Sequence, residues 1–173
     1  MPSIVKWFRA VLHRHEYKRW LKEEYLAWQR HATVYKFRET YQFVAGHQNE
    51  NGYLCEDSKA VILPDSIGEM EFVQNLRIAL KHSGAVDSQR VKYDRSKFLK
   101  AHRAKSYKDF YGHSTALSVS YDEYNQTVSV LSWRPAPGRG QVPVEGSKQI
   151  FDAHSEASWL QIKSILDGCA TPS

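Results

Sequence analysis

Histidines are the side chains of this sequence best suited to metal binding or general acid–base catalysis, and the chain has eight of them. Only His13 and His15 lie close together, and residues two apart point to different sides of a helix, so this pair cannot share a metal ion. Four others are isolated in the sequence: His47, His102, His113 and His154. Only the fold could bring a nucleophile, a base and an orienting acid together from them. The spacing of the histidines therefore predicts neither a metal site nor a catalytic site.

The cysteine and glycine patterns give no sign of catalysis either. Cys55 precedes Glu56 and Asp57, whose negative charges would raise the pKa of the thiol and disfavour a reactive thiolate. The Gly138-Arg-Gly140 segment lacks the lysine pattern of a phosphate-binding loop. We therefore expect no enzyme activity, no cofactor and no small-molecule ligand, and we interpret the protein as one that recognises a macromolecule.

Length and composition predict one domain, residues 1–173, without a membrane span. The sequence is 42% hydrophobic, and 24 Lys and Arg against 19 Asp and Glu give a formal charge of +5. Lys6, Arg9 and Arg14 interrupt the first apolar stretch, so we expect neither a membrane helix nor a secretion signal. Two cysteines, Cys55 and Cys169, are too few for a disulfide framework, which favours a cytoplasmic protein. A single disulfide bond between these two cysteines remains an alternative.

One segment in the middle of the chain combines the end of a strand with a helix. The apolar residues 60–63 predict the strand, and Ser66 with Glu69 has the spacing of a capping box, so a helix should begin near Ser66. Apolar residues recur along this helix at three- and four-residue spacing: Phe72, Val73, Leu76, Ala79 and Leu80. Lys81 places positive charge where the helix dipole is negative, and Gly84 can end the helix in the left-handed conformation.

The same order of elements returns near the C-terminus. Residues 149–151 are typical of a short strand, and Asp152 is a candidate helix cap. An apolar stripe follows and predicts a helix that ends before Gly168: Trp159, Ile162, Ile165 and Leu166. The two units form a weak internal repeat of a strand followed by a helix.

Alternating apolar residues predict the other strands. Residues 34–44 favour one half-buried strand that returns at 53–55, because aromatic residues alternate there: Tyr35, Phe37, Tyr41 and Phe43. The clearest hairpin spans 114–133 with a polar turn at 122–126, and the prolines and glycines of 134–143 predict a loop. The elements together predict an α+β fold. We expect a mostly antiparallel sheet with an N-terminal helix and with helices after each β unit, packed largely on one side.

The basic segment 4–31 predicts the N-terminal helix and has two interpretations. Aromatic residues lie among its lysines and arginines: Trp7, Phe8, Trp20 and Trp28. They could form an amphipathic surface for anionic lipid or nucleic acid, or they could pack a helix onto the sheet. Glu16, Glu23 and Glu24 interrupt the positive face and favour packing.

Several of these features together resemble the immunity proteins of bacterial contact-dependent growth inhibition, the broad CdiI family. The resemblance covers residues 33–169. It rests on the aromatic strand, the I-L-P-x-S-I-G-E-M run at 62–70, the L-x-x-x-L helix with a terminal Ser83, and a closing helix that ends in Gly168 and Cys169. It implies an immunity protein that binds and neutralises a cognate toxin C-terminal domain. The basic charge of the chain and its long basic N-terminal segment depart from this pattern.

The resemblance implies an interface, which we expect at an exposed strand edge and a hairpin tip, because unpaired strands and aromatic or Arg side chains anchor partners. The candidate partner-binding residues are Asp122, Glu123, Tyr124, Trp133 and Arg134. The alternative is nucleic-acid binding through the segment 92–108. Its basic and aromatic residues are interleaved: Lys92, Tyr93, Arg95, Lys97, Lys100, His102, Arg103, Lys105, Tyr107 and Lys108, with Phe110 beyond. A solvated helix face also explains this segment and is the interpretation that we prefer.

Overall fold

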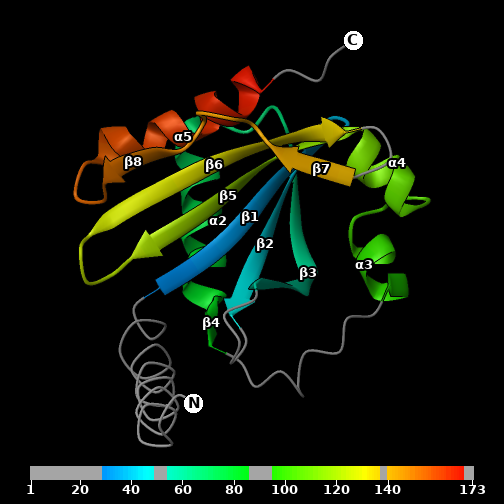
Figure 1. The fold of residues 1–173 in the computed structure, drawn as a ribbon, viewed down its shortest axis with the longest axis horizontal. Helices are drawn as coiled ribbons and strands as arrows, with labels where there is room; N and C mark the ends of the chain where they lie inside the picture. Colours follow the sequence, from blue (N-terminus) through cyan, green and yellow to red (C-terminus); the bar gives the residue numbers. More distant parts are fainter. Residues whose placement is uncertain (1–28, 49–53, 86–94, 137–139, 170–173) are drawn as a thin grey trace, which may run out of the picture.

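The computed structural model describes residues 29–48, 54–85, 95–136 and 140–169 (Figure 1). The strands in these ranges are β1 (Gln29–Phe37), β2 (Thr40–Gln48), β3 (Leu54–Pro64), β4 (Gly84–Ala85), β5 (Ser114–Asp122), β6 (Thr127–Ala136), β7 (Gly140–Pro143) and β8 (Gln149–Asp152). The helices are α2 (Glu69–His82), α3 (Arg95–Ala101), α4 (Tyr107–Gly112) and α5 (Glu156–Gly168). The helix predicted over 4–31 lies outside the described residues except at 29–31, which belong to β1 instead.

A single sheet in the order β3-β2-β1-β5-β6-β7 forms the centre of the fold. Seven strands pair antiparallel to their neighbours, and the short β4 runs parallel to β2. The predicted α+β class with a mostly antiparallel sheet is therefore confirmed. β8 and β7 pair with successive parts of the outer side of β6, so the outer strand of the 114–133 hairpin is covered there.

The single strand predicted over 34–44 is wrong, because the chain turns back at Arg38 and Glu39. Arg38 has a φ of 56°, which is uncommon for a residue with a side chain, and Phe37 pairs with Thr40 across the turn. The turn changes the face to which the alternating aromatics point. Those before it pack in one cluster and those after it in another. The return strand β3 is also longer than the predicted 53–55.

Helix α2 confirms the apolar stripe but not the predicted ends. All five residues of the stripe are buried. The N-cap is Gly68, which has no side chain to accept a capping hydrogen bond, and Glu69 is already in the first turn, so the capping box from Ser66 does not form. At the other end Ser83 is the C-cap, while Gly84 continues into β4 without a positive φ.

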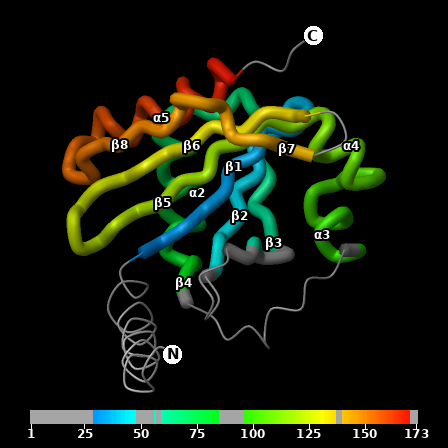
Figure 2. The backbone as a smooth tube through the Cα atoms, viewed as in Figure 1, coloured from blue at the N-terminus to red at the C-terminus, as the bar shows by residue number. Residues whose placement is uncertain are grey.

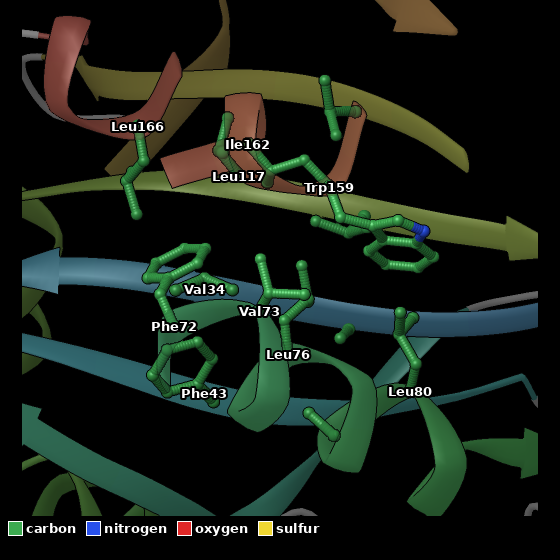
Figure 3. Close-up of a cluster of buried hydrophobic side chains, with 14 of the residues drawn as sticks. Val34, Phe43, Phe72, Val73, Leu76, Leu80, Leu117, Trp159, Ile162 and Leu166 are labelled. Atoms are coloured by element: carbon green, nitrogen blue, oxygen red, sulfur yellow. The ribbon is translucent and has the colours of Figure 1, made fainter. Parts of the chain in front are cut away.

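The larger hydrophobic core lies between the sheet and the pair α2 and α5 (Figure 3). Trp159, Ile162 and Leu166 of α5 are buried against Phe72 and Leu76 of α2 and against strand residues between them. The predicted stripe on α5 is thus confirmed, with Ile165 partly buried beside it. The helix is capped by Ser155, whose side chain accepts from the Ser158 N–H, rather than by Asp152.

A second core lies on the opposite face of the sheet, so the prediction that helices pack largely on one side is wrong. Tyr35 and Phe37 point away from the larger core, which we call the first core, because side chains alternate along β1. They pack against Phe98 of α3 and Phe110 of α4. Figures 1 and 2 show α3 and α4 set apart from α2 and α5. A sheet whose central strands are apolar on both faces needs cover on both.

The predicted loop at 134–143 is largely strand instead. β6 continues to Ala136 and pairs with β7, with Arg134 opposite Val142, and Pro135 and Pro143 lie in this outer pair of strands. Across the described residues, no helix combines the length and the apolar character needed to cross a membrane.

Candidate functional site

The five predicted partner-binding residues fall into two separate groups. Asp122, Glu123 and Tyr124 lie at the turn between β5 and β6, whereas Trp133 and Arg134 lie six and seven residues beyond Thr127, the first residue of β6. At about 3.4 Å per strand residue, this separation is about 20 Å. The structure therefore does not bring the five residues together into one site.

Asp122 shapes the turn rather than presenting a free carboxylate. It accepts hydrogen bonds from the backbone N–H groups of Tyr124 and Asn125, at 3.0 and 2.9 Å, and from the Asn125 side chain at 2.8 Å. Burial would raise the pKa of Asp122, but these hydrogen bonds outweigh it and hold the pKa below its ordinary value. The turn leaves Tyr124 78% exposed, so this aromatic ring is available to a partner.

Trp133 and Arg134 differ in their surroundings. The indole N–H of Trp133 donates to Ser118 Oγ at 2.8 Å, and the ring packs against the second core. Arg134 is exposed. Trp133 is therefore partly buried and contributes to the second core, and Arg134 is the more exposed of the two.

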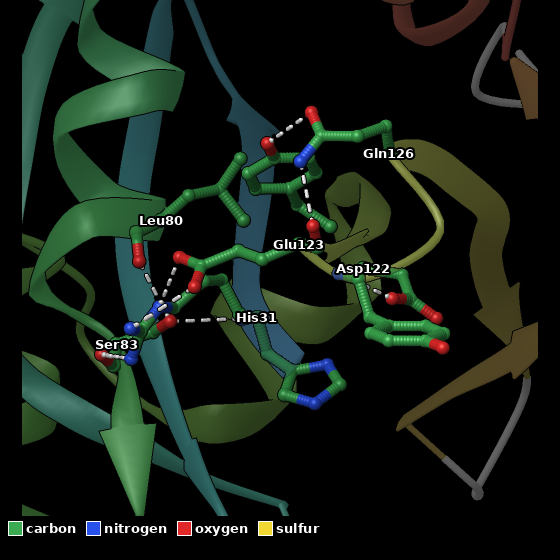
Figure 4. A network of polar contacts seen from close by, with 9 residues as sticks. His31, Leu80, Ser83, Asp122, Glu123 and Gln126 are labelled. Carbon is green, nitrogen blue, oxygen red and sulfur yellow. Dashed lines mark hydrogen bonds and ion pairs between the residues drawn. The ribbon is translucent and has the colours of Figure 1, made fainter. Parts of the chain in front are cut away.

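Glu123 belongs to a network that joins the β5–β6 turn to the end of α2 (Figure 4). Arg30 of β1 donates from Nε to Glu123 Oε1 at 2.8 Å and from Nη1 to the Ser83 carbonyl oxygen at 3.3 Å. Gln126 donates to the Glu123 carbonyl oxygen at 2.6 Å and accepts from the Tyr121 hydroxyl at 2.9 Å. Arg30 thereby holds three distant parts of the chain in one arrangement.

Ser83, at the end of α2, connects this network to β1 through its hydroxyl group. Its hydroxyl donates to the Leu80 carbonyl oxygen at 2.7 Å and accepts from the His31 N–H at 2.9 Å. The residue is buried, with 6% of its surface exposed, so water cannot replace these bonds freely.

We expect Ser83→Ala to lower the free energy of unfolding by about 1–3 kcal/mol, because it removes a buried hydroxyl that accepts from the His31 N–H and donates to the Leu80 carbonyl oxygen. Urea unfolding followed by circular dichroism would measure the change. Ser164→Ala on the exposed side of α5 is the matched control and should have little effect. Equal stability of the two variants would show that the Ser83 bonds do not fasten α2 to β1.

A hollow of about 300 Å³ opens beside this network, between the ends of α2 and β1, the β5–β6 turn and the start of α5. Its lining includes Arg30, Arg77, Lys81, Tyr121, Glu123 and Trp159. Arg77 pairs with Glu156 at 2.7 Å and places its guanidinium carbon 4.7 Å from the centroid of the Trp159 ring. The hollow combines charged hydrogen-bonding groups with aromatic surface, which are the groups that anchor protein interfaces.

The sequence prediction identified only Glu123 of these lining residues as a site residue. Arg30 lies within the N-terminal helix that the sequence predicts. The favourable charge of Lys81 at the end of a helix and the place of Trp159 in an apolar stripe already explain these two residues without a site. The signal that could have marked Arg77 is its exposed position on an amphipathic helix, which many solvated residues share.

The alternative nucleic-acid segment is only partly exposed. Lys97, Lys100, Arg103, Lys105 and Lys108 lie at the surface of α3, α4 and their connection, whereas Lys92 and Tyr93 lie outside the described residues. The aromatic groups proposed for base stacking are less accessible: Phe110 is fully buried, and Tyr107 packs against the second core beside Tyr111. His102 is also fully buried. The segment thus presents charge at the surface, with these rings turned into the protein.

Two other features bear on chemistry. In the parts of the chain that the structure describes, no group of three or more His, Cys, Asp and Glu side chains is arranged to hold a metal ion. Cys169 is a partly buried free thiol next to the first core.

Comparison with known proteins identifies relatives in structure. No protein-family model and no curated protein sequence matches the chain. A solved protein of unknown function from Neisseria meningitidis superposes with a TM-score of 0.66 at 12% identity, over 83% of this chain and 97% of that one. A chain of the CdiA-CT/CdiI toxin and immunity complex from Yersinia pseudotuberculosis superposes with a TM-score of 0.60 at 10% identity, over 82% of this chain and 95% of that one. The protein therefore shares its α+β fold with one component of a bacterial toxin and immunity complex.

Proposed function

We propose that this protein is an immunity protein that binds a cognate toxin C-terminal domain in a one-to-one complex and neutralises it. The observation that carries the proposal is the fold likeness to a chain of a toxin and immunity complex, which extends over 95% of that chain. The resemblance of residues 33–169 to contact-dependent growth inhibition immunity proteins supports the immunity role over the toxin role. The protein would act in the bacterial cytoplasm, by binding and without a cofactor.

The environment of His102 removes one of the isolated histidines from the candidates for a catalytic base. His102 is packed among aromatic rings, with the centroids of Phe98 and Phe110 at 4.2 and 4.6 Å from its own. A catalytic base needs access to the substrate from which it takes a proton. By contrast, the exposed Tyr124 and the charged hollow beside Glu123 are suited to recognition.

We expect calorimetric titration with the C-terminal domain encoded by the open reading frame immediately upstream to give tight one-to-one binding. Co-production of the two proteins in bacteria should also prevent the growth arrest caused by the toxin domain alone. Absence of both binding and protection would refute the immunity role.

Nucleic-acid binding is the second candidate, and the surface charge of α3 and α4 favours it. Titration of an oligonucleotide at two salt concentrations separates it from the first. Affinity that falls steeply with salt, with no binding to the upstream domain, would favour phosphate contacts. Tight toxin binding without an oligonucleotide signal would favour immunity.

A further inference from the structure

Two neighbouring side chains of α2 form a ridge between two hollows. Arg77 and Lys81 are four residues apart, so they lie on the same face of the helix. Both line the 300 Å³ hollow beside Glu123 and also an open groove of about 770 Å³ along the outer face of α2. A partner that enters one hollow would therefore continue into the other over these two residues.

The smaller hollow favours a negative group. Three cationic side chains line it, Arg30, Arg77 and Lys81, against the single carboxylate of Glu123. Arg30 is already paired with Glu123, and Arg77 is paired with Glu156. Lys81 forms no ion pair with any residue that the structure describes. Its ammonium group is the one that an incoming anion would neutralise.

The open groove favours apolar contacts. Met70 and Ile78 line it and are 64% and 41% exposed, which is high for large apolar side chains. Their positions on α2 place them beside the ridge, on the side away from the core stripe. The groove also contains Glu71 and Glu156, whose charges would repel an acidic group there, so the negative group of a partner fits the hollow beside Lys81 and not the groove.

We infer that this pair of hollows binds an acidic segment of the partner protein, with an Asp or Glu side chain in the hollow beside Lys81 and apolar residues over Met70 and Ile78. The inference deepens the proposed function and rests on it for the identity of the partner, the toxin domain. The walls of the smaller hollow are preformed, since the network around Arg30 and Ser83 fixes the β5–β6 turn against α2. Preformed walls reduce the entropy cost of binding.

The first test is the affinity of charge variants for the upstream toxin domain. Lys81→Glu should weaken binding by about tenfold or more, because it replaces the attracting charge with a repelling one. Lys81→Gln should have a smaller effect in the same direction. Lys100→Glu on α3 makes the same charge change at an exposed site on another face and should bind as tightly as the wild type. Thermal unfolding of each variant verifies that it folds.

Unchanged affinity of both Lys81 variants, with tight binding by the wild type, would overturn this inference and leave the immunity role intact. Failure of the wild type to bind the toxin domain would overturn the immunity role. In that case a second probe, which does not need the toxin, tests whether the two hollows bind an acidic segment.

That probe is a short capped peptide of alternating Glu and Leu, compared with its Lys and Leu counterpart. We expect the acidic peptide alone to shift the NMR signals of the Trp159 indole and the Lys81 amide. The shifts should be lost in Lys81→Glu and retained in Lys100→Glu. Absent shifts, or equal shifts in Lys81→Glu, would overturn the inference. Inorganic phosphate is tested in parallel, and shifts produced by phosphate but not by the acidic peptide would also overturn it in favour of a small-anion site.

Discussion

Replacement of Phe72 by alanine is expected to lower the free energy of unfolding by about 3–5 kcal/mol. Phe72 is fully buried at the centre of the larger core. Its ring makes edge contacts with Tyr41 and Phe43, each at a centroid distance of 5.1 Å. Truncation removes these contacts and the favourable free energy of transferring the ring from water to the core. It also leaves a cavity that the rigid strands on one side cannot fill. Urea unfolding at neutral pH would measure the loss.

Met70→Ala is the matched control, because it truncates a large apolar side chain on the same helix. Met70 is 64% exposed, so its loss should change the unfolding free energy by no more than about 0.5 kcal/mol. A loss below about 1 kcal/mol for Phe72→Ala would mean that α2 is not packed on the sheet as described.

The buried face of α2 shows what the sequence can predict. Periodic spacing identified every buried residue of this helix, because burial of an apolar stripe dominates helix stability in proteins. The ends of the helix depend on weaker local interactions, such as capping hydrogen bonds and turns. The Ile67 N–H bonds to the Pro64 carbonyl oxygen, so the chain makes a turn after β3 and the helix begins after Ser66. Ser66 and Glu69 keep the capping-box spacing but not its geometry.

The missed turn between β1 and β2 has a different cause. Arg38 and Glu39 are not residues that favour tight turns, and the aromatic residues before and after them keep the same alternating positions, with Glu39 in the place of one aromatic. Pairing of the two strands over seven residue pairs holds Arg38 in its left-handed conformation. Long-range pairing therefore overrides local preference here, and no local signal reports it.

The candidate site could not be assembled from the sequence, because its parts come from four separated elements. Arg30 and Glu123 are 93 residues apart, and Arg77 and Glu156 are 79 apart. Each residue has an ordinary local explanation as a solvated charge. Glu123 was identified through its place in a hairpin turn, a local feature, whereas its partners became visible only once the sheet order placed β1 beside β5.

The protein is expected to lose about 2–3 kcal/mol of stability through His102 alone when the pH falls from 7 to 4.5. His102 is fully buried, and burial lowers its pKa from the ordinary value of 6.5 to about 4. Gln42 donates from its amide to Thr40 Oγ1 and to the His102 carbonyl oxygen, so its Oε1 accepts from His102 Nδ1 at 2.5 Å. This assignment leaves the second ring nitrogen, Nε2, unprotonated.

The sign of the effect follows from where the proton would bind. Protonation would occur at Nε2, which is buried without a hydrogen-bond partner in the described structure. Well above pH 6.5 the ring is neutral in both states and contributes no pH dependence. Below that pH the unfolded chain takes up a proton that the folded protein excludes until about pH 4. The free energy of unfolding therefore falls as the pH drops through this window.

Comparison of the wild type with His102→Gln isolates this contribution. Glu56, which accepts from the Tyr35 hydroxyl near this histidine, has a pKa raised by burial, so it favours the folded protein at low pH and acts in the opposite direction. Because both proteins retain Glu56, its effect cancels in the difference between their pH profiles. Urea unfolding at several pH values should show a steeper loss for the wild type between pH 6.5 and 4.5. Parallel profiles would mean that His102 is protonated as readily in the folded protein as in the unfolded chain.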